Sequence, residues 1–272
     1  MENGISIVMT YHNRRNLLLR TLESINKTNY DKAKIQIIII NDNSSEEHYI
    51  DDLNDKYNGL YILVLNIGIK QKIWINSCVP YNIGFNHIKY DKVIIQNPEC
   101  YHQGDIITDV SKRLNDNLYL SYSCYSLTWE NTKLEDFNTV KISKKPIKIP
   151  MSDGWYNHSE YRPVFFHFCS AIYYDDLEDL NGFDERYKDG IAFDDNEIIE
   201  RLKYKGMDMK IIDGPFVFHQ AHHSIYHYNK NTPEEEKKRK NQLYFKNKDI
   251  FDNITKKERN YNAIDNKYFN KN

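Results

Sequence analysis

The sequence predicts an α/β protein with a Rossmann-like, doubly wound, mostly parallel sheet flanked by helices. Short, continuous apolar runs recur along its first half, as expected for strands that are covered on both faces. Segments with apolar residues at helical spacing alternate with these runs, which is typical of a parallel sheet with crossover helices. The runs end in polar loops, and ligands bind at the carboxyl edge of such sheets.

Strands and helices are expected in alternation over the first half. Leu18, Leu22 and Ile25 lie at helical spacing after Asn13, the predicted N-cap of the first helix. We expect strands at residues 5–10, 34–40, 60–66, 91–96 and 118–127. We expect further helices at residues 74–88, at residues 105–115, and after a capping sequence at residues 41–47 as far as about residue 57.

The second half is less regular. Residues 128–160 lack periodicity, and a segment of that length in a compact domain is either functional or mobile. Strands are expected again at residues 163–174 and within residues 209–223, with a helix between them that ends before Gly206. We expect one domain over residues 1–228, and a charged helical C-terminal extension over residues 229–272 that is either a solvated helix or a loose arm.

The amino-acid composition argues against several classes of protein. The chain has 272 residues and a formal net charge of −2, so no nucleic-acid partner is indicated. Its four cysteines show no CxxC spacing, which argues against zinc and for reduced thiols. We find no signal-peptide pattern and no membrane-spanning run, and therefore expect a cytoplasmic protein. Nothing in the sequence indicates an oligomeric state.

Two groups of residues carry types that metal ions and proton transfer require. Glu99 follows the strand at residues 91–96, and the strand expected within residues 209–223 leads into four histidines, which are His219, His222, His223 and His227. Carboxylate oxygens and imidazole nitrogens can together hold a divalent cation. A solvated turn and a loop of exposed histidines are the alternative interpretation.

A pair of acids begins an expected helix. Asp194 and Asp195 follow a turn-rich segment, and the N–H groups and macrodipole of a helix N-terminus keep carboxylates ionised. Capping of the helix by an aspartate is the alternative reading.

Four segments resemble family 2 glycosyltransferases, which have the GT-A fold. They are "SIVMTYHNR", "IIINDNSS", "CVPYNIGF" and "NGFDERYKDGIAFDDNEIIERL", and the last is similar to the galactosyltransferase-type C-terminal block. The resemblance covers residues 4–225, and it rests on the order and spacing of the segments. The chain departs from the family at Asn97-Pro98-Glu99, which replaces Asp-x-Asp, and at Tyr81, which replaces an arginine.

The resemblance implies an inverting transfer of a sugar from a UDP-sugar to a hydroxyl of a glycan or glycoconjugate. Residues 1–100 would form the nucleotide-binding half and residues 101–228 the acceptor-binding half. A divalent metal, Mn²⁺ before Mg²⁺, would neutralise the diphosphate through Glu99 with His219, the favoured histidine, or His222. Asp195 would be the general base, and Asp194 would bind an acceptor hydroxyl.

The resemblance also suggests ligand contacts. The expected donor-binding residues are Thr10, Tyr11, Asn13, Asp42, Asn82 and Asn97. Asp42 would accept the N3–H of uracil, although it also reads as part of a capping sequence, and Tyr11 could equally be a core aromatic. Trp155, Tyr156 and Trp129 are weaker candidates for stacking on an acceptor sugar, with a place in the core as the alternative.

Two rival functions remain at this level. A nucleotidyltransferase that makes sugar nucleotides shares this sheet, but it expects a glycine-rich loop after the first strand, and residues 9–15 contain no glycine. A degenerate carbohydrate-binding or scaffold protein is suggested by the incomplete Asp-x-Asp and by Tyr81. Release of UDP from a donor would separate an enzyme from a binder.

Overall fold

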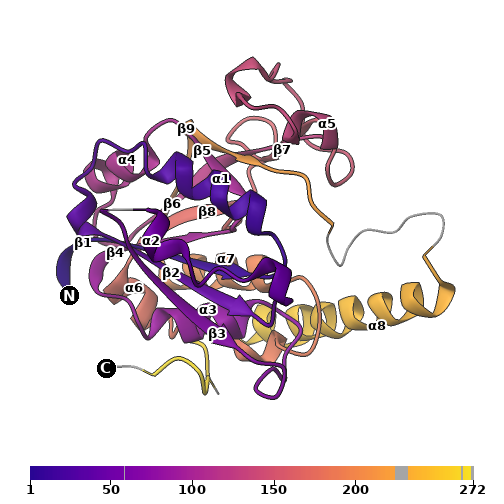
Figure 1. The fold of residues 1–272 in the computed structure, drawn as a ribbon. Coiled ribbons are helices and arrows are strands. Elements are labelled where there is room, and N and C mark those ends of the chain that lie inside the picture. The colour runs from indigo at the N-terminus through magenta and orange to yellow at the C-terminus, as the bar shows by residue number, and fades with distance from the viewer. Residues whose placement is uncertain (58, 224–231, 265, 271–272) are drawn as a thin grey trace.

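A computed structural model describes residues 1–57, 59–223, 232–264 and 266–270 of the chain. In this part of the chain, one nine-stranded sheet has the order β3-β2-β1-β4-β8-β6-β9-β5, and β7 pairs with β6 (Figure 1). The strands are β1 (Glu2–Tyr11), β2 (Ile35–Asp42), β3 (Tyr61–Ile67), β4 (Tyr90–Gln96), β5 (Cys100–Gln103), β6 (Leu118–Ser126), β7 (Gly154–Asn157), β8 (Cys169–Tyr173) and β9 (Asp208–His219). The helices are α1 (Arg15–Ile25), α2 (Leu53–Lys56), α3 (Cys78–Phe85), α4 (Ile106–Arg113), α5 (Trp129–Thr132), α6 (Tyr174–Asp179), α7 (Asp194–Lys205), α8 (Glu234–Ile250) and α9 (Lys256–Glu258).

The first four strands in the sheet order confirm the predicted fold class. β3, β2, β1 and β4 are all parallel, and Ile7 of β1 lies opposite Ile37 of β2 and Ile94 of β4. Alternate side chains of a strand face opposite sides of the sheet. Ile7 accordingly packs in a core with α1 and α4, whereas Val8 packs on the other face with α3, α6 and α7. Both faces are covered, which explains the continuous apolar runs.

The other half of the sheet is mixed in direction. β8 is antiparallel to both β4 and β6, β9 is parallel to β6, and the short edge strand β5 is antiparallel to β9. β5 and β7 were not predicted. The β5–β9 register places Cys100 opposite His219, so the residue before Cys100 lies beside the end of β9. This pairing brings Glu99 to the histidines.

Two helix predictions were too long, and one N-cap was wrong. The segment before residue 57 holds only a 3₁₀ turn (Glu46–His48) and α2, and α3 replaces the expected 74–88 helix. Asn13 has a φ of 51° and its side chain accepts from the Ser45 N–H, while Arg14 occupies the N-cap position. Asn41 likewise accepts from the Ser44 N–H. Such side-chain bonds to the backbone compete with helix formation in this loop.

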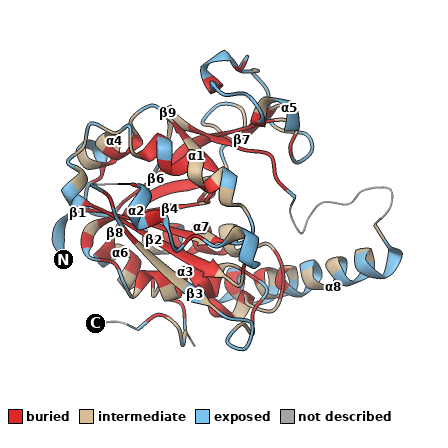
Figure 2. Cartoon of the chain, in the orientation of Figure 1, coloured by how far each residue is buried: buried red, intermediate tan, exposed pale blue. Residues whose placement is uncertain are grey.

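The C-terminal extension is solvated only in part. Much of the surface of α8 is exposed, as Figure 2 shows, but the segment after it returns to the domain. Phe269 is buried, and the Glu185 carboxylate accepts from the backbone N–H groups of Lys267 and Tyr268 at 2.7 and 3.0 Å. The Glu185 N–H in turn donates to Asn266. A loose arm is therefore wrong for residues 266–270.

Gly84 allows α3 to pack directly on the sheet, and Gly84→Ala should destabilise the fold. A Cβ at this position would lie 2.5 Å from Ile40 Cδ1 and 2.7 Å from Val8 Cγ1. We expect a loss of about 1–3 kcal/mol in the free energy of unfolding, since overpacking outweighs the better helix propensity of alanine. Denaturant unfolding measures this loss, with Gly68→Ala as the control because a Cβ at that site would meet only Gln71 Oε1, at an ordinary contact distance of 3.8 Å. Equal stability of the two variants would contradict this packing.

The four cysteines are buried and free. Among the described helices, none combines the length and the apolar character that crossing a bilayer requires.

Candidate functional site

Loops from both halves of the sheet meet at the carboxyl edge of the parallel strands. β1, β2 and β4 end at Tyr11, Asp42 and Gln96, and β9 ends at His219. Two clusters of possible ligand atoms are found there among the described residues: Glu99 with His219 and His222, and His167 with Asp194 and Asp195.

Glu99 is the centre of the first cluster. Its side chain is 2% exposed, and Arg14 Nη1 donates to Oε2 at 2.8 Å. The other oxygen, Oε1, lies 3.3 Å from His219 Nε2 and 3.1 Å from His222 Nε2. Arg14 therefore orients the carboxylate so that one oxygen faces both imidazoles.

The hydrogen bonds of His222 leave a lone pair directed at Glu99. His222 Nδ1 lies 2.9 Å from the carbonyl oxygen of His223, and a carbonyl can only accept, so Nδ1 carries the proton of this bond. In the neutral ring, Nε2 is then unprotonated and faces another acceptor, Glu99 Oε1. A cation between the two atoms relieves this repulsion, as does protonation of the ring.

Charge in the first cluster suits metal ligation. Burial by itself would raise the pKa of Glu99, but the charge of Arg14 and the imidazoles of His222 and His219 outweigh it and hold the pKa well below its ordinary value. Burial lowers the pKa of His219, which favours the neutral, ligating form. The cluster therefore offers an ionised carboxylate beside a neutral imidazole.

The spacing also fits a divalent ion. Adjacent ligands of an ion with bonds of about 2.1 Å lie about 3 Å apart. The two distances from Glu99 Oε1, 3.1 and 3.3 Å, match this value. His222 has the outer hydrogen-bond partner that ligating histidines usually have, the His223 carbonyl. His219 Nδ1 is buried without a hydrogen-bond partner, so the second shell is incomplete at that atom.

The second cluster lies at the start of α7. Asp194 accepts from Asn76 Nδ2 at 3.1 Å and from Ser77 Oγ at 3.2 Å, so both of its oxygens are engaged. Burial and the charge of Asp195 raise the pKa of Asp194. Among the described residues, Asp195 is contacted through Oδ1 alone, by the backbone N–H of His167 at 3.0 Å and by His167 Nδ1 at 2.6 Å.

The backbone before α7 is strained. Ala192 and Phe193 have φ values of 62° and 70°, in the left-handed region that non-glycine residues rarely adopt. Asn247 of α8 donates to the carbonyl oxygens of Ala192 and Tyr187, at 2.9 and 3.0 Å. The helix of the C-terminal extension thus supports the turn that presents the two acids.

Residues 167–168 connect the clusters. His167 contacts Asp195, while the ring of the next residue, Phe168, packs against His219 at 5.7 Å between centroids. The Phe168 carbonyl accepts from the Asn97 N–H at 3.1 Å. The hydroxyl of Tyr81 donates to Gln96 O at 3.1 Å, and its ring lies 5.4 Å from that of His167. The two clusters therefore belong to one packed unit.

The predicted donor-binding residues have different surroundings. Asp42 accepts from Lys72 Nζ at 2.5 Å and from Trp74 Nε1 at 3.2 Å, so each oxygen already has a donor. The ring of Tyr11 is buried and its hydroxyl donates to His48 O at 2.7 Å, which makes it a core aromatic that cannot stack on a base. Thr10 and Asn97 are half-buried at the same edge of the sheet.

Asn82 and Trp155 are placed away from any open surface. The Asn82 amide donates to Phe183 O and Glu185 Oε1, each at 2.8 Å, and accepts from the Phe183 N–H. It joins α3 to the Gly-Phe-Asp-Glu block and has no free group for a donor. Trp155 is buried and donates to Ser143 O, so the core alternative holds for it.

Two other aromatic candidates lie near the first cluster. The Tyr156 ring is 5.0 Å from that of His219, and the Trp129 ring, 38% exposed, is 4.8 Å from that of His223. His227, the last of the predicted histidines, lies outside the described residues.

The sequence did not indicate His167, nor Lys72 and Trp74 as partners of Asp42, nor the pairing of Arg14 with Glu99. His167 lies within the strand expected at residues 163–174. The sequence offered one signal for such residues: a charged or titratable residue within an apolar run, or directly after one.

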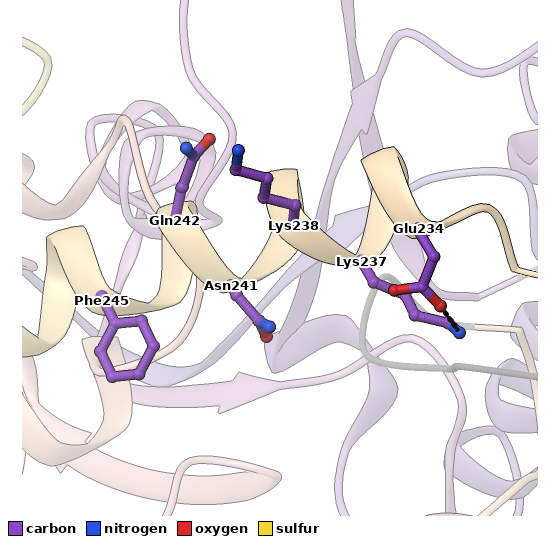
Figure 3. Close-up of a pocket in the computed structure, with 6 residues that line it drawn as sticks. All are labelled: Glu234, Lys237, Lys238, Asn241, Gln242 and Phe245. Carbon is purple, nitrogen blue, oxygen red and sulfur yellow. Dashed lines mark hydrogen bonds and ion pairs between the residues drawn. The ribbon is translucent and has the colours of Figure 1, made fainter.

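A hollow along α8 carries no comparable chemistry. It measures about 560 Å³ and is lined by Glu234, Lys237, Lys238, Asn241, Gln242 and Phe245. Figure 3 shows these side chains along one helix, with an ion pair between Glu234 and Lys237. All of the described lining residues come from α8, so no second element completes a site.

The N-terminal part of the chain is similar to a known family. Residues 6–117 match Glycosyl transferase family 2. The matched segment includes Arg14, Asp42 and Glu99, whereas Asp195, His219 and His222 lie beyond it. The segment that resembles the galactosyltransferase-type block also lies beyond it, and no family match shows that block. No curated protein sequence gives a significant match.

Solved structures share the fold. A mannosyltransferase from Pyrobaculum calidifontis, PcManGT in complex with GDP-Man and Mn²⁺, aligns with a TM-score of 0.57 and 12% identity over 89% of this chain and 62% of that chain. S. aureus TarS 1–349 in complex with UDP-GlcNAc aligns with a TM-score of 0.57 and 11% identity over 83% of this chain and 62% of that one. This chain thus spans about three-fifths of these structures. These likenesses show that the fold is GT-A.

Proposed function

We propose that the protein is an inverting glycosyltransferase that moves a sugar from a UDP-sugar to a hydroxyl of a glycan or glycoconjugate. The observation that carries the proposal is the meeting of two clusters at one sheet edge: a carboxylate with two histidines, and a carboxylate at a helix N-terminus with one free oxygen. The first cluster would hold the metal ion that binds the diphosphate of the donor, and the second would supply the general base.

The donor half would be formed by residues 1–100. Glu99, His219 and His222 would hold a divalent cation, Mn²⁺ in preference to Mg²⁺ because imidazole is among its ligands. Such an ion supplies charge neutralisation to the diphosphate leaving group. The Arg14 side chain lies beside Glu99, is 26% exposed, and is available to bind a phosphate oxygen. Arg14 would thereby replace the phosphate contact of the family's arginine, because this chain has Tyr81 at that position. Thr10, Asn13 and Asn97 line the same edge.

Recognition of uracil by Asp42 requires a rearrangement. Both carboxylate oxygens have donors in this structure, Lys72 and Trp74. A carboxylate oxygen has more than one lone pair, so N3–H of uracil can share Asp42 with Trp74 once Lys72 turns to the O4 carbonyl. We propose this arrangement for binding of the uracil ring.

The acceptor half would be formed by residues 101–228. The acceptor hydroxyl loses its proton to Asp195 Oδ2 as its oxygen forms a bond to the anomeric carbon. The bond from that carbon to the diphosphate oxygen breaks, and the electron pair leaves with UDP. Asp194, anchored by Asn76 and Ser77, would orient a second acceptor hydroxyl, and Tyr156 and Trp129 offer apolar faces for the sugar.

The direct test is release of UDP from a panel of UDP-sugars, with water as the acceptor, in Mn²⁺ and in EDTA. We expect slow, metal-dependent release from at least one donor. A chain that binds UDP but releases none from any donor would be a carbohydrate-binding or scaffold protein, the alternative suggested by Tyr81 and Asn97. A parallel panel of GDP-sugars tests whether uracil is the nucleobase of the donor.

A further inference from the structure

His167 holds one oxygen of the proposed base inside the protein. Its side chain is 5% exposed, whereas that of Asp195 is 29% exposed. Both His167 contacts, from Nδ1 at 2.6 Å and from the backbone N–H at 3.0 Å, fall on Asp195 Oδ1. The carboxylate therefore has a buried, anchored oxygen and a side that reaches solvent.

We infer that His167 is a positioning residue for the base: it anchors Asp195 through Oδ1 and leaves Oδ2 to receive the proton of the acceptor hydroxyl. The inference rests on the proposed function, in which Asp195 is that base. A fixed carboxylate matters because proton transfer requires the acceptor hydroxyl within hydrogen-bond reach of a defined oxygen.

A metal ion shared by His167 and Asp195 does not fit the geometry. Two ligands of one ion would be about 3 Å apart. The distance of 2.6 Å between Nδ1 and Oδ1 is shorter than that and is the distance of a close ion pair, beside the hydrogen bond that the His167 backbone N–H donates to the same oxygen. The second cluster is therefore a histidine–carboxylate pair.

The imidazole is itself held by its neighbours. The rings of Tyr81 and Phe183 meet it edge-on, with centroids at 5.4 and 4.9 Å. On the next residue, Phe168 binds the Asn97 N–H through its carbonyl and packs against His219 through its ring. Because one dipeptide contacts both clusters, it sets the distance between the base and the diphosphate site.

Charge around the pair favours a cationic His167. Burial by itself would lower the pKa of His167, but the charge of Asp195, followed by that of Asp194, raises it above its ordinary value. The other titratable groups that face the pair are Tyr81 of α3 and Tyr119 of β6. Burial raises the pKa of both tyrosines, so they stay neutral near pH 7 and do not add a charge to the pair.

Two variants separate the polar contact of the His167 side chain with Oδ1 from its charge. His167→Asn keeps an amide donor near the position of Nδ1 but carries no charge, and His167→Ala removes both. UDP release from UDP-sugars is measured between pH 5 and pH 9, together with the Kd of UDP in Mn²⁺. We expect kcat of the alanine variant to fall about 10–100-fold, as for other residues that orient a reacting group, with the Kd unchanged.

The pH profile distinguishes positioning from a merely structural role. The pKa of His167 is raised, so kcat of the wild-type chain should fall as the pH rises through that pKa and the ring loses its charge, and this alkaline limb should be absent from both variants. The asparagine variant keeps an amide donor beside Oδ1 and should retain more activity than the alanine variant. Equal losses in the two variants, with the alkaline limb still present in both, would overturn the inference.

A matched control is His158→Asn. His158 Nε2 lies 3.7 Å from Asp213 Oδ1, so it is also a histidine beside an aspartate, but it contacts neither cluster. It should leave the pH profile unchanged. A wild-type chain that binds UDP and releases none from any donor overturns both the proposed function and this role. A wild-type chain that turns over, with His167 variants that match it in kcat and pH profile, overturns the inference alone.

Discussion

Asp195→Asn is expected to lower UDP-sugar turnover about 10³-fold while the Kd of UDP stays unchanged. The amide is almost the same size and can still accept from His167 through its oxygen, so the start of α7 should keep its shape. It cannot take a proton from the acceptor hydroxyl. The effect should therefore appear in kcat, measured as UDP release under saturating donor, with calorimetry for the Kd.

Two other carboxylates, Asp194 and Asp189, serve as comparisons for Asp195→Asn. Asp194→Asn should reduce turnover less and raise the KM for an acceptor, because both Asp194 oxygens are engaged by Asn76 and Ser77. Asp189→Asn is a control, since Asp189 is an exposed acid whose partner is Lys246. If Asp194→Asn were the inactive variant and Asp195→Asn remained active, the base assignment would have to move by one residue.

The fold was predictable because it depends on local patterns. β1, β2 and β4 are continuous apolar runs, and the parallel sheet follows from the helices between them. β5 was not predictable in this way. It has four residues, and it exists only because it pairs with β9, more than a hundred positions later in the chain. Its register is nevertheless the feature that brings Glu99 to His219.

The grouping of candidate residues could be expected where residue type and chain position agreed. Glu99, His219, His222 and Asp195 lie at or next to strand or helix ends, where polar groups are conspicuous. The surroundings of Tyr11 and Asn82 could not be expected in this way, because whether a side chain points into the core or toward a ligand is decided by neighbours such as His48 and Phe183. Arg14 and His167 needed the tertiary structure, since each acts on a carboxylate far away in the sequence.

Glu99→Gln is expected to weaken binding of UDP in Mn²⁺ about 100-fold or more, since even outer partners of metal ligands account for 10–100-fold in affinity. Glutamine preserves the shape of the buried side chain but loses the charge that His219, His222 and Arg14 surround. The measurement is calorimetric titration of UDP with Mn²⁺ and then with EDTA. In the wild-type chain, EDTA should reproduce most of the loss; in the variant, it should change little.

Two further variants and one contrary result complete the test of Glu99. Glu23→Gln removes an exposed carboxylate on α1 and should leave the affinity unchanged. Arg14→Lys keeps the charge beside Glu99 but loses the planar donor group, so it should weaken UDP binding less than Glu99→Gln. If the wild-type chain binds UDP equally well in Mn²⁺ and in EDTA, the diphosphate is neutralised by protein cations. Arg14, already 2.8 Å from Glu99, would then be the first residue to test in place of the metal.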